Sequence, residues 1–413
     1  MHKEFNVHQY PNGITLLHKQ VLSTRIAHCG YIFDVGSRDE NLKNQGLAHF
    51  WEHMAFKGTE KRKTFQILSS LEEVGGDLNA YTTKEKIWFH ASLPYTYLER
   101  ATDILTDISF FSTFPEKEIE KEKKVVIEEM HMYADSPEDA IQDEFESVIF
   151  PNHSLGYNIL GTEKTLSAFT QEHLVKFLKK NIDTSRVAFV VLSPHSFSEV
   201  KAIADKYIPF VKAQHIVKIR EKNRGFKPTT LIKSIDASQT HCVIGGIGLN
   251  IKEERRLGLF LLSNLLAGPG MTSMLNMAMR EKKGYVYTIE SNFTSYIDTG
   301  VYSFYFATEA KQFEKALEVF HKEVAKVREK KLSTSHLYRL KEQIKGQLIM
   351  AEENNSNFMQ MMGKSYLDFG KIDSFDQIVK KIDGISADVI IDLANQLMNP
   401  ARMSKLVYEP EIK

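Results

Sequence analysis

The sequence predicts an α+β protein made of two related halves, and three observations support that prediction. The chain of 413 residues is 42% hydrophobic, which is enough for two or three domains with sizeable cores. Strand-like and helix-like patterns alternate along it. The pattern also partly repeats, because His28-Cys29 and His241-Cys242 each begin a β-rich run that is followed by a charged turn and a helix.

The first half begins with strands and continues with helices. Residues 14–19 follow a Pro-Asn-Gly turn signal and are predicted to form a strand, as is the β-rich run 26–35. A helical pattern then covers residues 44–56. The other elements predicted in this half are helices over 64–74, 95–113 and 115–134 and a strand over 86–93.

The middle of the chain contains the best candidate for a linker. In residues 213–228 charged side chains mix with Gly225 and Pro228, and apolar periodicity weakens on both sides. This linker separates a predicted N-terminal domain, 1–212, from a predicted C-terminal domain, 229–413. Each domain then holds one copy of the repeated pattern.

Composition excludes several classes of partner. The 53 basic residues balance the 53 acidic ones, whereas domains that bind a phosphate backbone normally carry a basic excess, so no nucleic acid partner is expected. Two cysteines, Cys29 and Cys242, are too few for a disulfide framework and favour a reduced compartment. The sequence shows no signal-peptide pattern and no apolar run of membrane-spanning length. We therefore expect a cytoplasmic protein with no membrane partner.

One short motif carries chemistry. His49, Glu52 and His53 occupy positions i, i+3 and i+4 of a predicted helix, so their side chains share one face. Two imidazoles one turn apart can bind one Zn²⁺ ion, and the carboxylate between them can take a proton from a metal-bound water. This order is the inverted form of the common zinc-protease motif. The alternative is a pair of ordinary histidines on a half-exposed helix.

A third metal ligand is available on the predicted helix 115–134. Glu122 and Glu129 are seven residues apart and lie nearly in line, whereas Glu128 is rotated from that line by about 100°. One carboxylate can complete a zinc site while another holds an imidazole. The alternative is a solvated acidic face paired with neighbouring lysines. Spacing alone does not select Glu129.

These residues resemble the pitrilysin/insulinase family of zinc peptidases, which includes the mitochondrial processing peptidase and short bacterial relatives. The resemblance is carried by HFWEH (49–53) and by VVIEEM (125–130), in which Glu129 follows His53 by 76 positions (129 − 53). The segments GSRDE (36–40) and GGDLNAYTT (75–83) also contribute to it. It covers essentially the whole chain. It implies two homologous α/β-sandwich domains, each a mostly antiparallel sheet packed against helices, the first catalytic and the second not.

The resemblance also implies a role for each residue of the motif. It implies zinc ligation by His49, His53 and Glu129, general-base catalysis by Glu52, and support of the site by Glu122. Trp51 stands where the family more often has Leu. It lies off the ligand face, so we expect it to affect packing alone.

Two further segments are implied to bind substrate. GGDLNAYTT resembles the family's edge strand, which pairs with the substrate backbone as an added strand, with Asn79 and Ala80 nearest the scissile bond and Thr82 in the same strand. The alternative is a turn followed by an ordinary strand. Arg280 and Tyr287 match an Arg and a Tyr that bind substrate and stabilise charge on its carbonyl. The alternative is a helix-end charge and a plain strand residue.

The second copy of the pattern has lost the metal residues. In an alignment on the shared Gly-Leu, the positions of His49 and His53 are taken by Leu261 and Leu265. Family members of this length pair two chains, so we expect a homodimer or a heterodimer with a related chain. In such a dimer the Arg280 and Tyr287 that serve a given zinc can come from either chain.

The sequence thus predicts a zinc metalloendopeptidase that hydrolyses extended or unfolded peptides inside a closed chamber. The alternative is a non-catalytic subunit that binds peptides or supports assembly of a peptidase complex. The substrate and the cleavage preference are not encoded in any recognisable motif.

Overall fold

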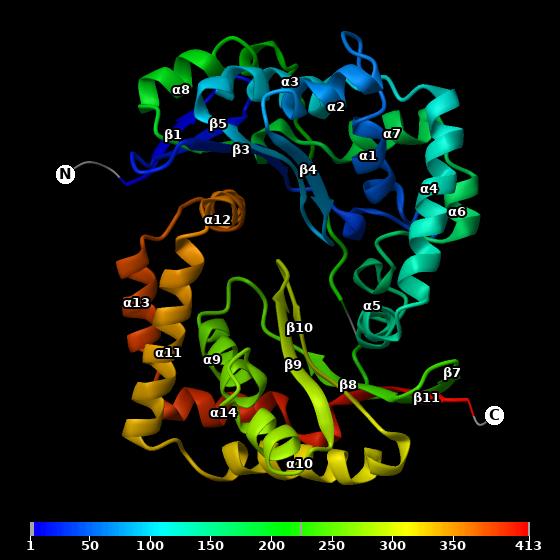
Figure 1. Cartoon of the computed structure of the whole chain (residues 1–413), viewed down its shortest axis with the longest axis vertical. Coiled ribbons are helices and arrows are strands. Elements are labelled where there is room, and N and C mark those ends of the chain that lie inside the picture. The colour runs from blue at the N-terminus through cyan, green and yellow to red at the C-terminus, as the bar shows by residue number, and fades with distance from the viewer. Residues whose placement is uncertain (1–3, 224, 412–413) are drawn as a thin grey trace. The chain divides into compact units, whose positions relative to one another are not determined.

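The computed structural model describes residues 4–223 and 225–411 and forms two compact units (Figure 1). Each unit includes one segment from the other half of the sequence, and in this respect the units differ from the contiguous domains predicted above. Unit 1 comprises Met1–Met130, Tyr157–Arg220 and Ile349–Ser374, and unit 2 comprises His131–Gly156, Glu221–Leu348 and Phe375–Lys413.

Unit 1 is built on a six-stranded sheet with the order β1-β2-β6-β3-β5-β4. The β2–β6 pair is parallel and the other pairs are antiparallel. Thus β4 lies at one edge of the sheet. The strands are β1 (Asn6–Gln9), β2 (Thr15–Gln20), β3 (Ile26–Phe33), β4 (Asp77–Thr82), β5 (Ile87–Pro94) and β6 (Val187–Ser193).

Helices cover both faces of this sheet. One face packs against helices from the first half of the chain to form the larger core. The other face packs against α12, whose Met359 and Met362 are fully buried beside Trp88. The helices are α1 (Leu47–Ala55), α2 (Thr64–Glu72), α3 (Leu98–Phe110), α6 (Glu163–Ser167), α7 (Gln171–Asn181), α8 (Phe197–Ala204), α12 (Asn355–Phe369), and α4 (Glu116–Ala134), which continues into unit 2.

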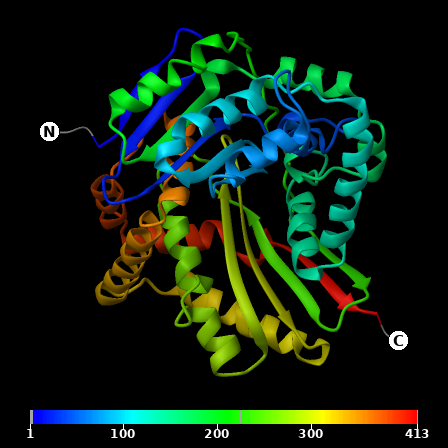
Figure 2. The same cartoon turned by 45° about the horizontal axis from the view of Figure 1, so that its top comes forward.

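Unit 2 is built on a five-stranded sheet with the order β7-β11-β8-β10-β9. The β7–β11 pair is parallel and the others are antiparallel. Strands β9 and β10 form a long hairpin that stands out in both views (Figure 2). The strands are β7 (Thr230–Ile235), β8 (Thr240–Ile247), β9 (Val286–Ser295), β10 (Gly300–Thr308) and β11 (Ser404–Pro410).

The second sheet is also covered on both faces. Helices from the second half of the chain form the core on one face, and α5 packs on the other through Ile141, Phe145 and Ile149. The helices are α5 (Pro137–Ile149), α9 (Arg256–Ala267), α10 (Phe313–Glu329), α13 (Phe375–Asp383), α14 (Ala387–Leu397), and α11 (Thr334–Glu352), which continues into unit 1.

The two sheets confirm the predicted α+β class with two related halves. From β2 to β4 and from β7 to β9, the strands follow the same spatial order with the same parallel and antiparallel pairs. In both sheets the strand that contains the His-Cys pair is followed by a helix, α1 after β3 and α9 after β8. The strands and helices predicted in the first half are also present. The largest difference is the predicted helix 95–113, which begins with a 3-10 turn at Tyr95–Tyr97 and ends at Phe110.

The predicted linker is anchored to unit 1 by buried ion pairs. Asp34 Oδ1 lies 2.8 Å from Lys86 Nζ and 3.2 Å from Arg220 Nη1. Asp39 Oδ1 lies 2.9 Å from Arg220 Nε, and Asp39 also pairs with Lys218. Since Lys218 and Arg220 belong to the linker segment, these two residues hold that segment against the end of β3.

No helix in the described part of the chain is both long enough and apolar enough to cross a membrane.

Candidate metal centre

Helix α1 presents its motif because its apolar residues take the opposite face. Trp51 is fully buried and packs edge to face against Phe33, with 5.3 Å between ring centroids. Phe50 and Met54 are also fully buried. As expected, Trp51 contributes to packing, and the remaining face is left to His49, Glu52 and His53.

The structure brings His49, His53 and Glu129 together. Glu129, from α4, has one carboxylate oxygen 3.7 Å from His49 Nε2 and the other 3.4 Å from His53 Nε2. One ligand atom from each residue lies within 4.8 Å of the others. Glu128, on the same helix, is exposed to solvent. Of the glutamates that spacing left open, Glu129 is the one that faces both imidazoles.

Glu122 fixes the orientation of one imidazole. Its Oε1 lies 2.9 Å from His53 Nδ1, and its Oε2 lies 2.7 Å from Lys57 Nζ. Although burial acts in the opposite direction, His53 and Lys57 lower the pKa of Glu122. The ionised carboxylate accepts the Nδ1 proton of His53, so Nε2 of the same ring turns toward Glu129.

The two imidazoles have different protonation properties. Burial, together with the neighbouring His53 ring, lowers the pKa of His49 to about 4. Burial acts in the same direction on His53, but the hydrogen bonds that its ring donates to Glu122 and Glu129 outweigh burial and raise the pKa of His53 to about 9. A neutral His49 can offer its Nε2 lone pair to a metal, while a cation at the centre would replace the proton that His53 shares with Glu129.

Glu52 lies on the same face of α1 and meets the edge strand. Its Oε2 accepts a hydrogen bond from Thr82 Oγ1 at 2.6 Å. Burial raises the pKa of Glu52, and the Thr82 hydrogen bond and the charge of His53 act against this rise. A carboxylate that binds a proton more readily than usual suits a general base.

The segment GGDLNAYTT contains a turn and then β4, which is the edge strand of its sheet as predicted. The backbone N–H of Ala80 donates to the side chain of Asn79, whose Oδ1 is 2.8 Å away. The neighbouring strand β5 therefore does not take this N–H, which faces the open edge. Asn79 is exposed to solvent. This edge can accept an added strand.

Arg280 and Tyr287 lie together in unit 2. Arg280 is in the π-helical segment Asn276–Glu281, and Tyr287 is in β9. The Arg280 guanidinium carbon is 5.3 Å from the centroid of the Tyr287 ring. Tyr287 is 79% exposed, so the pair presents donors at the surface of its unit. Irregular helical turns of this kind are frequent at functional sites.

The counterpart helix in unit 2 is apolar at the metal positions. Leu261 and Leu265 are buried in the core, and Asn264 Nδ2 bonds the carbonyl oxygen of Phe260 at 3.0 Å. Within the described part of the chain, the group of His49, His53 and Glu129 is the one identified cluster of potential metal ligands. Two nitrogen donors and one carboxylate with an adjacent base match the donor set of catalytic zinc sites.

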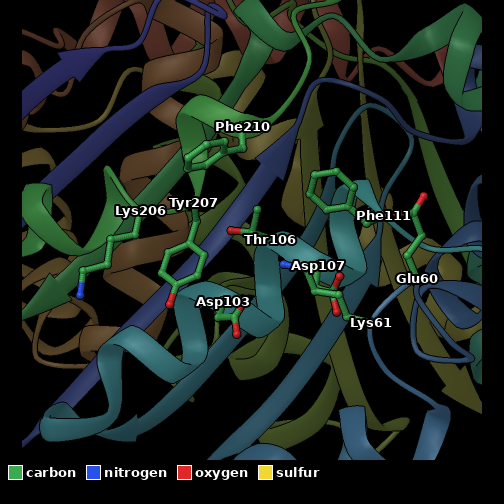
Figure 3. Close-up of a pocket in the computed structure, with 9 residues that line it drawn as sticks. All are labelled: Glu60, Lys61, Asp103, Thr106, Asp107, Phe111, Lys206, Tyr207 and Phe210. Carbon is green, nitrogen blue, oxygen red and sulfur yellow. The ribbon is translucent and has the colours of Figure 1, made fainter.

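A separate pocket of about 160 Å³ in unit 1 contains none of the predicted site residues (Figure 3). Two of its acidic residues, Asp103 and Asp107, already pair with Arg62. It therefore does not compete with the metal cluster as the candidate site. The pocket is lined by Glu60, Lys61, Asp103, Thr106, Asp107, Phe111, Lys206, Tyr207 and Phe210.

Two residues near the site were not identified from the sequence. Lys57 neutralises Glu122, and its position four residues after His53 was an available signal. Glu40 accepts hydrogen bonds from the first backbone N–H groups of α1. It belongs to the GSRDE segment, which contributes to the family resemblance but to which no role was assigned from the sequence.

The fold and the site together define a class of protein: a short chain of two related α+β units, with an inverted His-x-x-Glu-His helix and a downstream glutamate in the first. Models of known families agree with this class. The family described as "Insulinase (Peptidase family M16)" matches residues 16–163, and the one described as "Peptidase M16 inactive domain" matches residues 168–344. The chain belongs to the insulinase family of peptidases, family M16, as a short two-domain member.

Relatives with similar sequences support the same assignment. A Bacillus subtilis protein named an uncharacterized zinc protease is 33% identical over 386 residues, which is 94% of each chain. A Rickettsia felis protein, also named an uncharacterized zinc protease, is 32% identical over 418 residues and covers 100% of both chains. The present chain is similar to both along almost its entire length.

Two solved structures show the same fold. A peptidase M16 inactive domain from Pseudomonas fluorescens aligns with a TM-score of 0.90 at 18% identity, over 99% of each chain. A protease from Helicobacter pylori aligns with a TM-score of 0.89 at 19% identity, over 98% of this chain and 99% of that one.

Proposed function

We propose that this protein is a zinc metalloendopeptidase. The observation that carries the proposal is the convergence of His49, His53 and Glu129, with ligand atoms within 4.8 Å of one another, beside a half-buried Glu52. These three side chains would hold the ion. When bound, zinc polarises a substrate carbonyl and lowers the pKa of water to about 7.

Glu52 is the group that moves protons in this proposal. Its carboxylate takes a proton from the attacking water and then delivers it to the leaving amine of the cleaved peptide. Thr82 holds one carboxylate oxygen at 2.6 Å, so the other oxygen is left to face the reacting atoms. The pKa of Glu52, raised by burial, favours the transfer.

The proposed substrate is an extended or unfolded peptide, held inside a closed chamber. Its backbone would pair with the open edge of β4, where the Ala80 N–H is directed outward. Main-chain pairing makes weak demands on side chains. Arg280 and Tyr287 would donate hydrogen bonds to the substrate carbonyl as negative charge develops on it.

We further propose that the protein works as a dimer in the cytoplasm, with a second copy or a related chain. This chain has both the metal residues and the Arg280–Tyr287 pair, so a homodimer needs no companion to complete its sites. The competing function is a non-catalytic subunit that binds peptides or supports assembly. It is disfavoured because such a subunit does not require His49, Glu52, His53 and Glu129 to converge.

A cleavage assay separates these two functions. We expect protein purified without chelators to contain one zinc per chain and to cleave members of a quenched-fluorescence peptide library. A chelator should abolish cleavage, and added zinc should restore it. Stoichiometric zinc without cleavage would favour the non-catalytic subunit, and absence of zinc would contradict the ligand set.

A further inference from the structure

The start of α1 is capped by a residue that lies outside the helix. The buried carboxylate of Glu40 accepts a hydrogen bond from the Gly46 N–H at 2.8 Å through Oε2 and from the Ala48 N–H at 2.6 Å through Oε1. The first N–H groups of a helix lack partners within the helix and attract negative charge. Burial raises the pKa of Glu40 to about 8, and the hydrogen bonds from the Ala48 and Gly46 N–H groups act against that rise.

The cap comes from a distance because the helix cannot cap itself. Gly46 occupies the N-cap position with φ of 88°, in the left-handed region that favours glycine. A Cβ at this position would lie 2.4 Å from the carbonyl oxygen of Leu160. Ser, Thr, Asp and Asn, the usual capping residues, are therefore excluded, and Glu40 supplies the acceptor in their place.

The capped turn carries the first metal ligand. Ala48, which donates one of the two hydrogen bonds, directly precedes His49. The Nδ1 atom of His49 is buried without a hydrogen-bond partner in the part of the chain that the structure describes, whereas Glu122 holds His53. The position of His49 therefore depends on the backbone of this turn rather than on a partner for its ring.

The related helix of unit 2 provides a comparison within the same chain. In α9 the N-cap residue is Arg255, whose own side chain makes no capping hydrogen bond. The position that corresponds to His49 is Leu261, which is buried in an apolar core. A carboxylate thus caps the helix that carries the ligands, whereas an arginine occupies the N-cap of the helix that only packs.

We propose that Glu40 is a positioning residue for the metal centre. Its carboxylate fixes the first turn of α1, and through that turn it sets the place of His49 and, one turn later, of Glu52 and His53. The inference rests on the proposed zinc peptidase function. The GSRDE segment supplies neither a metal ligand nor the base, and this inference gives the segment a role.

The test compares Glu40→Gln with Glu40→Asp in the full-length protein. Three quantities are measured: zinc affinity by competition with a chromogenic chelator, the visible absorption spectrum with Co²⁺ in place of zinc, and kcat and KM on a quenched peptide. For Glu40→Gln we expect zinc affinity to fall by about 10- to 100-fold, the usual effect of removing support for a ligand. We also expect an altered cobalt spectrum and a lower kcat at unchanged KM, with Glu40→Asp intermediate.

Asp107→Asn is the matched control. Asp107 is a buried carboxylate of unit 1 that bonds Thr59 and Arg62, at 2.7 and 2.6 Å, rather than α1. This variant should lower the melting temperature but leave the cobalt spectrum and zinc affinity unchanged. The same spectral change in this control at equal loss of stability would overturn the proposal.

The outcomes also separate this inference from the function on which it rests. Wild-type protein that binds no zinc overturns both. Wild-type protein that binds zinc and cleaves peptides, while Glu40→Gln matches it in zinc affinity, cobalt spectrum and kcat, overturns the role of Glu40 alone. If Glu40→Gln does not fold, Glu40→Asp decides: a lower kcat at unchanged KM supports the proposal, and wild-type values contradict it.

Discussion

Glu122 and Glu129 have different partners although they lie seven residues apart on one helix. Glu129 faces the Nε2 atoms of both histidines, whereas Glu122 is bonded to His53 Nδ1 and to Lys57. The geometry therefore separates a candidate ligand from a residue that orients a ligand. We therefore expect substitutions of Glu122 and Glu129 to affect zinc binding differently.

We expect Glu122→Gln to weaken zinc binding by about 10- to 100-fold while the protein remains folded. The amide removes the negative charge that accepts the His53 Nδ1 proton and leaves Lys57 without its partner. A chelator competition assay measures the effect. The control is Glu128→Gln, an exposed change on the same helix, which should leave zinc affinity at the wild-type value. Equal zinc affinities in wild type, Glu122→Gln and Glu128→Gln would show that Glu122 does not support the metal site.

At the residue scale, the sequence predicted the candidates better than their arrangement. Helical spacing placed His49, Glu52 and His53 on one face, but it left several glutamates of α4 open because the rotation of that helix depends on packing. Glu40 could not be found by spacing. Its hydrogen bonds to Gly46 and Ala48 depend on the path of the connecting loop.

Among the elements, β4 has the clearest functional geometry. It is the edge strand of its sheet, and exposed edges offer unpaired backbone groups to another strand. The Ala80 N–H is directed to that edge, where it meets only the side chain of its neighbour Asn79 among the contacts described. An incoming peptide backbone can displace that local contact.

Ala80→Pro removes this N–H from the open edge without removing a donor from the β4–β5 ladder. We expect kcat/KM for extended peptides to fall by about tenfold, the effect of losing one good hydrogen bond. Zinc content should not change. Ala80→Gly, which retains the N–H, should stay close to wild type. If the proline variant cleaves as well as the glycine variant, substrate pairing at this position is wrong.

The linker segment is the other element with a specific energetic role. Asp34 is buried with Lys86 and Arg220. Although burial acts in the opposite direction, these cations hold the pKa of Asp34 far below its usual value. The resulting stabilisation is complete above the usual aspartate pKa of about 4 and is lost progressively as the pH falls below it.

We therefore expect Asp34→Asn to destabilise the protein by about 3–5 kcal/mol at pH 7, because it leaves buried cations without their partner. The difference in the free energy of unfolding between wild type and Asp34→Asn should shrink by about 1.4 kcal/mol per pH unit below pH 4. Urea unfolding at pH 7 and pH 3 measures both values. Asp205→Asn, at a partly exposed pair with Lys201, should cost less than about 1 kcal/mol. A difference that is the same at both pH values would refute the ionic role of Asp34.

At the element scale, local patterns predicted individual strands and helices but not the exchange of segments between the units. Helices α5 and α12 each pack on the sheet of the other half of the sequence. An apolar helix face shows that a helix is covered, but it does not show which of two similar sheets covers it. Contiguous domains were the natural prediction for that reason.

At the scale of the whole molecule, the two units have similar folds but different chemistry. The strand order is repeated, yet the ligand positions of α1 are apolar in α9. The first unit carries the metal cluster, and the second carries Arg280 and Tyr287. The proposed dimer raises the question of which chain supplies the Arg280 and Tyr287 that serve a given zinc.

Mixing two inactive variants answers this question. Glu52→Gln lacks the base but retains Arg280, and Arg280→Ala lacks the arginine but retains the base. In a homodimer that shares residues between chains, one site of each mixed pair has both groups, so we expect mixing to restore cleavage. The mass of the mixture in solution should be twice that of the 47.4 kDa chain. A dimer whose mixture stays inactive would place Arg280 beside the zinc of its own chain.

The central claim is that Glu52 is the general base beside a zinc ion held by His49, His53 and Glu129. The most direct test is to measure zinc content and peptide hydrolysis together in Glu52→Gln. We expect one zinc per chain, as in wild type, and a rate of hydrolysis lower by about 10²- to 10⁴-fold. Hydrolysis at the wild-type rate, with zinc bound, would contradict it.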